Sequence, residues 1–228
     1  MQYSIKVNEV KNKEGSIRGF ATVVFGDSFK ITNISIHENR EKGQLFVSMP
    51  RYKSNERDEH NEAVYKDVCN PITAEFREEL YGKILEAYEH VVAHTEEKQE
   101  DTEKSREMPT FTVKVTPFER ENSNIRGLAR IYFEDSFVVG NVNILQGKES
   151  LFVAMPSYKT NKKDDQGKPV YQDICYPVTK EFREKLYGEI MECYEQEKSK
   201  KHDEIRRENA DRYNEDKKME REEELPFR

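Results

Sequence analysis

Apolar and polar residues alternate in short stretches near the start of the chain, each followed by turn-forming residues. Residues 3–10 alternate, which predicts a strand, and residues 17–25 are rich in β-branched and aromatic residues, which predicts a second. Gly26 and Asp27 then favour a tight turn, so the second and third strands should form a hairpin. The apolar period of the third strand slips at Thr32-Asn33. A β-bulge there would keep both ends of the strand facing the core.

The next segment changes from strand to helix patterning. Residues 45–49 form a short apolar strand that Pro50 ends, followed by a polar loop and a last extended piece over residues 64–69. Thr73 is the expected N-cap of a helix. Apolar residues every four positions predict one helical face that packs on the sheet, made by Phe76, Leu80, Ile84 and Tyr88.

The same pattern occurs twice, which decides the architecture. IRGFATVVFGDSFKITNISI (residues 17–36) aligns with IRGLARIYFEDSFVVGNVNI (residues 125–144), and LFVSMPRYKSN (45–55) aligns with LFVAMPSYKTN (151–161). Roughly half of the aligned residues are identical, a density that chance does not produce over this length. The sequence therefore predicts an α+β protein: two tandem copies of a small antiparallel β-sheet domain, each with a C-terminal helix, forming an intramolecular pseudo-dimer.

The repeat fixes the expected boundaries: a first copy over residues 1–92, a charged linker over 93–109, a second copy over 110–196, and a charged tail over 197–228. The slip of the third strand recurs at Gly140-Asn141, and the helical stripe recurs as Phe182, Leu186, Ile190 and Tyr194. Gly82 and Gly188 lie mid-helix, where glycine costs about 1 kcal/mol relative to alanine. Close packing of another backbone would explain them; a tolerated accident is the alternative.

Composition refines this picture. Hydrophobic residues make up 35% and charged residues 36% of the 228 residues, so two small cores fit better than one large core. The net charge of −7 repels nucleic acid at long range, so any nucleic-acid binding must use local basic patches. The tail is a further charged segment, and an exposed helix or a disordered chain are both open for it.

Cysteine usage and the absence of long apolar runs predict a cytoplasmic protein. Cys69 and Cys175 occupy equivalent positions and, with Cys193, make no disulfide framework, so we expect small buried side chains in a reducing compartment. No signal-peptide pattern opens the chain. The longest apolar runs are about five residues, far short of the ~20 that a membrane span needs, so no membrane association is expected.

The run F-V-x-M-P-x-Y-K-x-N, followed by V-Y-x-D-[VI]-C-x-P-[IV]-T, carries a resemblance to the SpoVG family (stage V sporulation protein G, or septation protein). The first block is Phe46, Val47, Met49 and Pro50, with Phe152, Val153, Met155 and Pro156 in the second copy. The second block is Asp67, Pro71 and Ile72, with Asp173, Pro177 and Val178. Asn70 and Tyr176 stand where that family commonly has histidine. The resemblance covers both copies but neither the linker nor the tail.

The resemblance implies a small α+β domain that dimerises and acts as a DNA- and RNA-binding regulator in bacteria, associated with septation and sporulation. A covalent duplication would supply the pair within one chain, giving a monomer with pseudo-two-fold symmetry. Phosphate contacts are expected from basic residues of the loop and the helix start, and base stacking from two tyrosines. These residues are Arg51, Tyr52, Lys53, Arg57, Lys66 and Arg77, then Tyr158, Lys159, Lys162, Lys163, Lys168 and Arg183.

Other chemistries have little support in the sequence. His90 and His94 have a spacing that could hold a metal, but the second copy has Gln196 and Lys200 there, so no metal or cofactor is expected. Phosphate-loop, dinucleotide-binding and nucleophile-elbow motifs are absent, and Ser28 and Ser136 are primarily turn residues, so we expect no enzyme. The alternative function is a protein-interaction adaptor that binds a partner through its acidic surface and tail.

Overall fold

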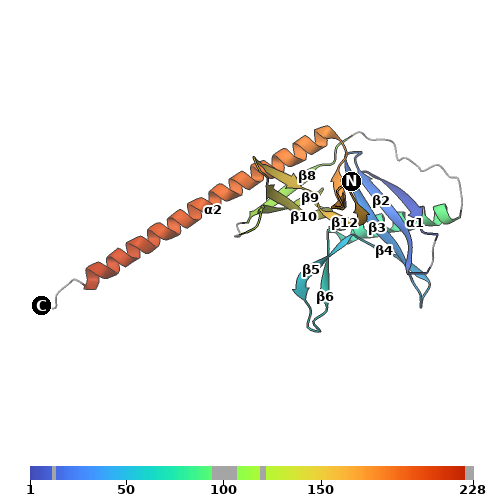
Figure 1. Cartoon of the computed structure of the whole chain (residues 1–228), viewed down its shortest axis with the longest axis horizontal. Helices are drawn as coiled ribbons and strands as arrows, with labels where there is room; N and C mark the ends of the chain where they lie inside the picture. The colour runs from blue at the N-terminus through green and yellow to red at the C-terminus, as the bar shows by residue number, and fades with distance from the viewer. Residues whose placement is uncertain (12–13, 94–106, 119–121, 224–228) are drawn as a thin grey trace.

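The computed structural model describes residues 1–11, 14–93, 107–118 and 122–223, with backbone alone for 214–223. The first repeat is built from seven strands and one helix, and the first four strands and the helix follow the chain in the order in which the sequence predicts them (Figure 1). They are β1 (Tyr3–Glu9), β2 (Ile17–Phe25), β3 (Phe29–Asn39), β4 (Gln44–Ser48), β5 (Arg51–Arg57), β6 (Ala63–Asp67), β7 (Cys69–Pro71) and α1 (Ala74–Val92).

The second repeat has the same element order, which confirms the α+β class and the tandem arrangement. Its elements are β8 (Phe111–Pro117), β9 (Ile125–Phe133), β10 (Phe137–Gln146), β11 (Leu151–Ala154), β12 (Ser157–Lys163), β13 (Pro169–Asp173), β14 (Cys175–Pro177) and α2 (Lys180–Glu223). In each repeat the first four strands form an antiparallel meander.

The slip in the third strand of each repeat is a β-bulge, as the sequence predicts. The register between β2 and β3 shifts between Ile31 and Ile34, where two residues of β3 lie opposite one residue of β2, and Asn33 has a φ of 60°. Asn141 takes the equivalent conformation, with a φ of 54°. Asparagine tolerates this left-handed region better than most residues. Ile31 and Ile34 are both fully buried as a result.

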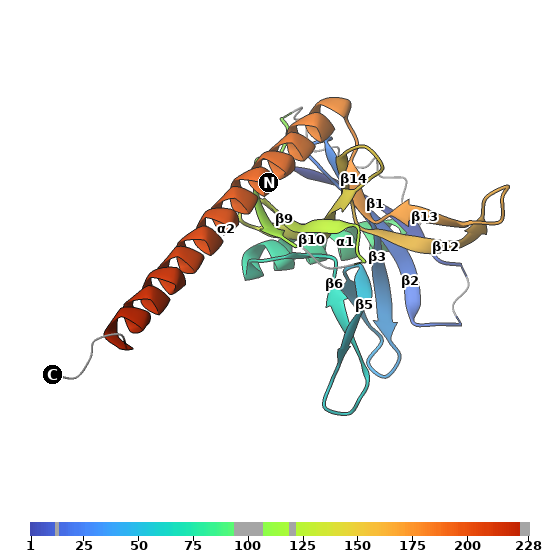
Figure 2. The same cartoon turned by 60° about the vertical axis from the view of Figure 1, so that its left-hand side comes forward.

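The expectation of a polar loop after Pro50 is wrong, because this segment is a second hairpin. β5 pairs antiparallel with β6 in a two-stranded sheet, and β12 pairs with β13 in the same way. Polar residues dominate both sides of these hairpins. Apolar and polar residues therefore do not alternate along them, and the sequence pattern does not predict strands. Figure 2 shows the two hairpins leaving the body in different directions.

The two repeats exchange a strand. β7 of the first repeat pairs with β10 of the second, and β14 pairs with β3. Each exchanged strand is anchored at the bulge of its partner: the Gly140 amide donates to the Val68 carbonyl (2.8 Å), and the Thr32 amide donates to the Ile174 carbonyl (2.8 Å). The predicted pseudo-dimer therefore has a reciprocal connection, and neither sheet is completed by its own repeat alone.

The expectation of two separate small cores is also wrong, because the buried side chains form one continuous cluster. Phenylalanines from equivalent positions meet across the pseudo-two-fold axis. The rings of Phe25 and Phe137 lie 5.1 Å apart, those of Phe29 and Phe133 lie 4.8 Å apart, and those of Phe25 and Phe133 lie 5.6 Å apart, all measured between centroids. Fusing the two cores buries more apolar surface than either small domain could bury alone.

Each helix begins at a threonine N-cap and buries the predicted stripe. The Thr73 hydroxyl accepts from the Phe76 amide (3.2 Å), and the Thr179 hydroxyl accepts from the Phe182 amide (3.2 Å). The stripe residues of both helices are buried. The close-packing explanation for Gly82 and Gly188 is wrong, since a Cβ at either position would meet nothing within 4 Å.

The second helix continues far beyond the sheet that it covers. α2 has 44 residues and extends away from the body, so the tail is helical up to Glu223, and its side chains from Ser199 to Tyr213 are exposed (Figure 1). An exposed helix is one of the two alternatives for this tail. At 1.5 Å per residue it is roughly 66 Å long. Among the described residues, no helix is long and apolar enough to cross a membrane. Residues 94–106 of the expected linker lie outside the described part.

Candidate nucleic-acid interface

The candidate basic residues lie mainly on the two projecting hairpins. Those of the first repeat are on β5 and β6, and those of the second are on β12 and the turn before β13. Their side chains are exposed, apart from the half-buried Lys66. The structure thus brings the candidates of each repeat together on a two-stranded ribbon whose far part is exposed to solvent.

Carboxylates neutralise two of the basic residues on the first hairpin. The Arg51 Nε donates to the Asp67 carboxylate (2.7 Å), and the Lys66 ammonium donates to Glu56 (2.6 Å). Both pairs link residues of facing strands. Since these side chains are partly exposed, each pair adds little stability, but a phosphate would have to compete with the resident carboxylate for the cation.

The second hairpin has a different electrostatic arrangement. Ser157 and Gln172 stand where the first hairpin has Arg51 and Lys66, and Gln172 accepts a hydrogen bond from the Tyr158 hydroxyl (3.0 Å). Asp173 therefore faces Ser157 in the strand register. Burial raises the pKa of the Asp173 carboxyl, and the charge of Arg183 partly offsets that rise.

Arg77 and Arg183 lie in the first helical turns, where we expect either an ion pair or a phosphate contact. Each guanidinium donates to the last carbonyl of the exchanged strand just before it, Arg77 to Pro71 (3.3 Å) and Arg183 to Pro177 (3.2 Å). The nearby carboxylate of Asp67 pairs with Arg51. Both arginines thus help to fix the exchanged strand against the helix that follows it.

The tyrosines of the hairpins fall into two groups. Tyr52 and Tyr158, the expected stacking residues, are half-buried and pack against the core. Tyr65 and Tyr171, which the sequence reasoning missed, are 59% and 63% exposed. They lie opposite Lys53 and Lys159 in the register, so a lysine is the cross-strand neighbour of each exposed tyrosine. The conserved spacing of V-Y-x-D in both repeats is the signal that could have singled them out.

The motif that contains the cysteines has a structural explanation. Cys69 and Cys175 lie on the exchanged strands and are fully buried, as predicted for small apolar side chains. Burial raises the pKa of both thiols. Val68 and Ile174, just before them, donate their amides to the carbonyls of Pro50 and Pro156 (2.8 Å each), which fixes the base of each hairpin.

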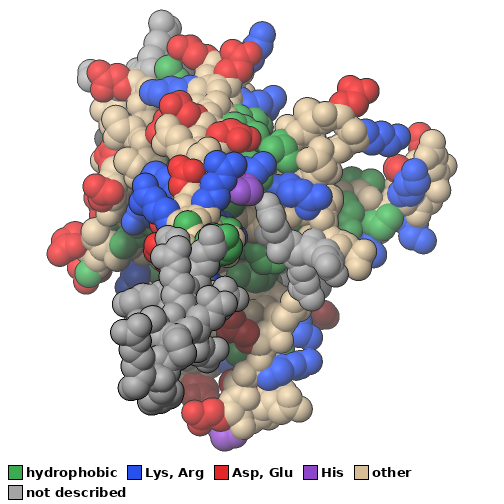
Figure 3. Space-filling view, turned by 90° about the vertical axis from the view of Figure 1, so that its left-hand side faces the viewer, with side chains coloured by type: hydrophobic (Ala, Val, Ile, Leu, Met, Phe, Trp, Pro, Cys, Tyr) green, Lys and Arg blue, Asp and Glu red, His purple; other side chains and the backbone are tan. Residues whose placement is uncertain are grey.

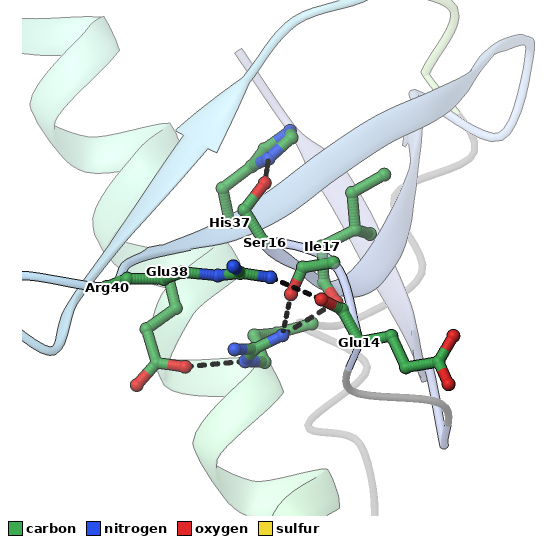
Figure 4. Close-up of polar contacts among 8 residues, drawn as sticks. Glu14, Ser16, Ile17, His37, Glu38 and Arg40 are labelled. Atoms are coloured by element: carbon green, nitrogen blue, oxygen red, sulfur yellow. Dashed lines mark hydrogen bonds and ion pairs between the residues drawn. The ribbon is translucent and has the colours of Figure 1, made fainter.

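A polar cluster around His37, for which the second repeat has Leu145, lies where β2 begins and β3 ends (Figure 4). His37 Nδ1 lies 3.2 Å from the Ser16 hydroxyl, Nε2 lies 2.9 Å from the Ser35 hydroxyl, and the ring stacks on exposed Phe46. Nearby, Arg18 donates to Glu38 (2.6 Å) and Arg40 to the Glu14 carbonyl. Burial lowers the pKa of His37, which favours a neutral ring. These contacts tie the start of β2 to the end of β3.

The turn serines make local contacts. Ser28 is buried and donates its hydroxyl to the Gly26 carbonyl (2.8 Å), and Ser136 donates to the Glu134 carbonyl (2.9 Å). Among the residues described here, no group of three or more His, Cys, Asp or Glu side chains is arranged to hold a metal ion.

The geometry defines a class of protein: a tandem α+β chain whose two units exchange a strand around one core and present two projecting hairpins. The family model described as SpoVG matches the chain twice, over residues 1–90 and 108–196. The chain belongs to the SpoVG family, as a tandem duplication of its domain.

Individual relatives correspond to one repeat each. A protein named "Putative septation protein SpoVG" from Phytoplasma australiense is 36% identical over 88 residues, which is 39% of this chain and 84% of that protein. Proteins of the same name from Treponema denticola and Clostridium beijerinckii are 34% identical over 73 residues and 35% identical over 71 residues. These matches span 32% and 31% of this chain, and 72% and 71% of the relatives.

Proposed function

We propose that this chain is a nucleic-acid-binding regulatory protein that acts in septation and sporulation, and that it is not an enzyme. The observation that carries the proposal is the placement of lysines and an exposed tyrosine on a projecting hairpin. A ribbon two strands wide can approach the phosphate backbone without a clash from the body, and lysines supply point charges for phosphates. An exposed tyrosine beside a lysine offers a stacking face for an unpaired base.

The proposal includes that the protein acts as a monomer. The pseudo-two-fold axis between its repeats would replace the two-fold axis of a dimer. The strand exchange supports it, because each sheet already receives its last strand from the other half of the same chain. A solution mass of one chain at low concentration is the expected result, and a mass well above one chain would contradict it.

Salt-dependent gel shifts with labelled DNA and RNA test the function. Binding should weaken by about 100-fold between roughly 50 and 200 mM salt if about four phosphates are neutralised. The double variant Lys159→Ala with Lys163→Ala should lose most of the binding. Binding of wild type that does not respond to salt would argue against phosphate contacts.

A protein-interaction adaptor is the second candidate, and the extension of α2 favours it. This helix projects beyond the sheet and exposes Ile205 and Tyr213, which are 45% and 59% accessible. Together with the net charge of −7, it could dock a basic partner protein. If no DNA or RNA binds even at low salt, the adaptor function is supported and the nucleic-acid function is rejected.

A further inference from the structure

We infer that the two hairpins are not equivalent, and that the β12–β13 hairpin alone carries the contact with the phosphate backbone. This inference rests on the proposed function and assigns the binding site within it. Duplication usually provides two copies of a site, but here the two copies have diverged in the property that a polyanion recognises, which is local charge.

The charge balance differs in sign between the hairpins. Residues 51–67 contain four basic and five acidic residues, whereas residues 157–173 contain four basic and three acidic residues. Two of the differences are full reversals at equivalent positions: Glu56 corresponds to Lys162, and Glu62 corresponds to Lys168. The reversals lie toward the tips, where the hairpins reach farthest from the body.

The ion pairs amplify the difference. On the first hairpin, Arg51 and Lys66 already hold Asp67 and Glu56 at 2.7 and 2.6 Å. On the second hairpin no ion pair is found within the described residues for the four lysines, Lys159, Lys162, Lys163 and Lys168. The second hairpin thus offers free cations, while two cations of the first would first have to leave a carboxylate.

The tips have the same backbone but different side chains. Asp58 accepts hydrogen bonds from the amides of His60 and Glu62, and Asp164 accepts from the amides of Gln166 and Lys168 at the equivalent positions. The backbone of the turn is therefore the same in both hairpins, while its net charge changes from −3 over residues 58–62 to −1 over residues 164–168, because Lys168 stands where the first hairpin has Glu62. Figure 3 shows basic and acidic side chains together on the hairpin that projects to the right, and basic side chains along the lower hairpin with acidic ones and a histidine at its tip.

The directions of the two hairpins favour a single nucleic-acid-binding site rather than two. They leave the body in different directions, so one straight segment of nucleic acid would not follow both (Figure 2). Tyr171, 63% exposed and opposite Lys159, adds a stacking face to the hairpin with the positive balance. The ligand that fits this surface is a polynucleotide held through its phosphates, with one base on the tyrosine ring.

The test compares equal charge removal on equivalent positions of the full-length chain. One variant carries Lys159→Ala with Lys163→Ala, and the matched variant carries Lys53→Ala with Arg57→Ala. All four side chains are exposed, and thermal unfolding checks that both variants keep the fold. Binding to a fluorescent single-stranded oligonucleotide and to its duplex is measured by anisotropy at low and high salt.

The first variant should weaken binding about tenfold or more at low salt and flatten the salt dependence by about two phosphate contacts. The matched variant should change the dissociation constant less than twofold. Adding Glu56→Lys with Glu62→Lys to the first variant should restore binding, because it gives the first hairpin the charge pattern of the second.

Each other outcome is decisive. Equal losses in the two variants, or no loss in the first, would overturn the single-hairpin assignment while wild-type binding still upheld the proposed function. Failure of the wild-type chain to bind either oligonucleotide at low salt would instead reject the proposed function, and the assignment with it.

Discussion

The ring of Phe29 in the first repeat lies 4.8 Å from the ring of Phe133 in the second, centroid to centroid. Both side chains are fully buried, and the equivalent pair on the other side of the pseudo-axis is Phe137 with Phe25. The contact lies between the repeats, so the stability of each half depends on the other.

Replacing either ring should therefore destabilise the whole chain in one transition. Phe29→Ala or Phe133→Ala should reduce the free energy of unfolding by about 3–5 kcal/mol, the usual cost of a cavity left by a large aromatic ring. Chemical denaturation measures the loss. Phe46→Ala is the control, because Phe46 is 48% exposed, and it should cost under about 1 kcal/mol. Two separate transitions would contradict the shared core.

The strand exchange predicts how an isolated repeat behaves. In a fragment of residues 1–92, β7 loses its partner β10, and β3 loses its partner β14. Two fragments can restore both pairings by exchanging β7 with each other, and they would also cover their exposed phenylalanines. Analytical ultracentrifugation should give a mass of two fragments, while the full chain gives one chain. A stable monomeric fragment would be evidence against this reading of the exchange.

The helical glycines predict a gain in stability. A Cβ at Gly82 or Gly188 would meet nothing within 4 Å, so alanine adds helix propensity without a clash. Gly82→Ala and Gly188→Ala should each raise the free energy of unfolding by about 0.5–1 kcal/mol. Thermal unfolding of the two single variants and the double variant measures the gain. A loss would mean that these positions have a role that packing does not reveal.

Replacing Gly26 by alanine should lower the free energy of unfolding, in contrast to the two helical glycines. Its φ is 48°, and an added Cβ would clash with the Glu107 carbonyl oxygen and lie 2.8 Å from Pro109. Gly26→Ala should thus cost more than the roughly 1 kcal/mol of left-handed strain alone. The second repeat has Glu134 at the equivalent position with a φ of 45°, and its carboxylate pairs with the Met1 amino group (2.9 Å). Glu134→Gln keeps a side chain of the same size and an oxygen that can accept from that amino group, so it is the matched control in the same unfolding assay. Equal losses of stability at the two turns would show that the close approach of Glu107 and Pro109 is not the reason for the glycine at position 26.

The His37 cluster predicts a pH dependence of stability. Burial lowers the pKa of His37 in the folded state, so the unfolded chain binds the proton more readily. The neutral His37 ring therefore contributes to the free energy of unfolding. This contribution is fully present above the ordinary histidine pKa and is lost as the pH falls through the lower pKa of the folded state. Unfolding temperatures at neutral pH and at pH about 5 should therefore differ less in His37→Leu than in wild type. Leucine is a matched choice because Leu145 occupies this position in the second repeat. An unchanged difference would exclude His37 as the titrating group.

Local patterns in the sequence predicted most of the secondary structure. Apolar residues recur every two positions in β1 to β4 and every four positions in the helix from Phe76. The bulge at Asn33 shows as a break in the first of these periods. All three features depend only on residues close together in the sequence. The internal repeat predicted that the second half has the same elements. The hairpin of β5 and β6 was missed because its residues are polar on both faces, which leaves no apolar period to detect.

The sequence by itself determined that there are two equivalent α+β units, because identical patterns must form identical local elements. Only the tertiary structure decided that β7 and β14 cross to the other unit and that the phenylalanines merge two cores into one. A three-residue strand such as Cys69–Pro71 carries no information about which edge it will join. The sheet edge that such a strand pairs with depends on which unpaired strand and which apolar surface lie near it in the folded chain.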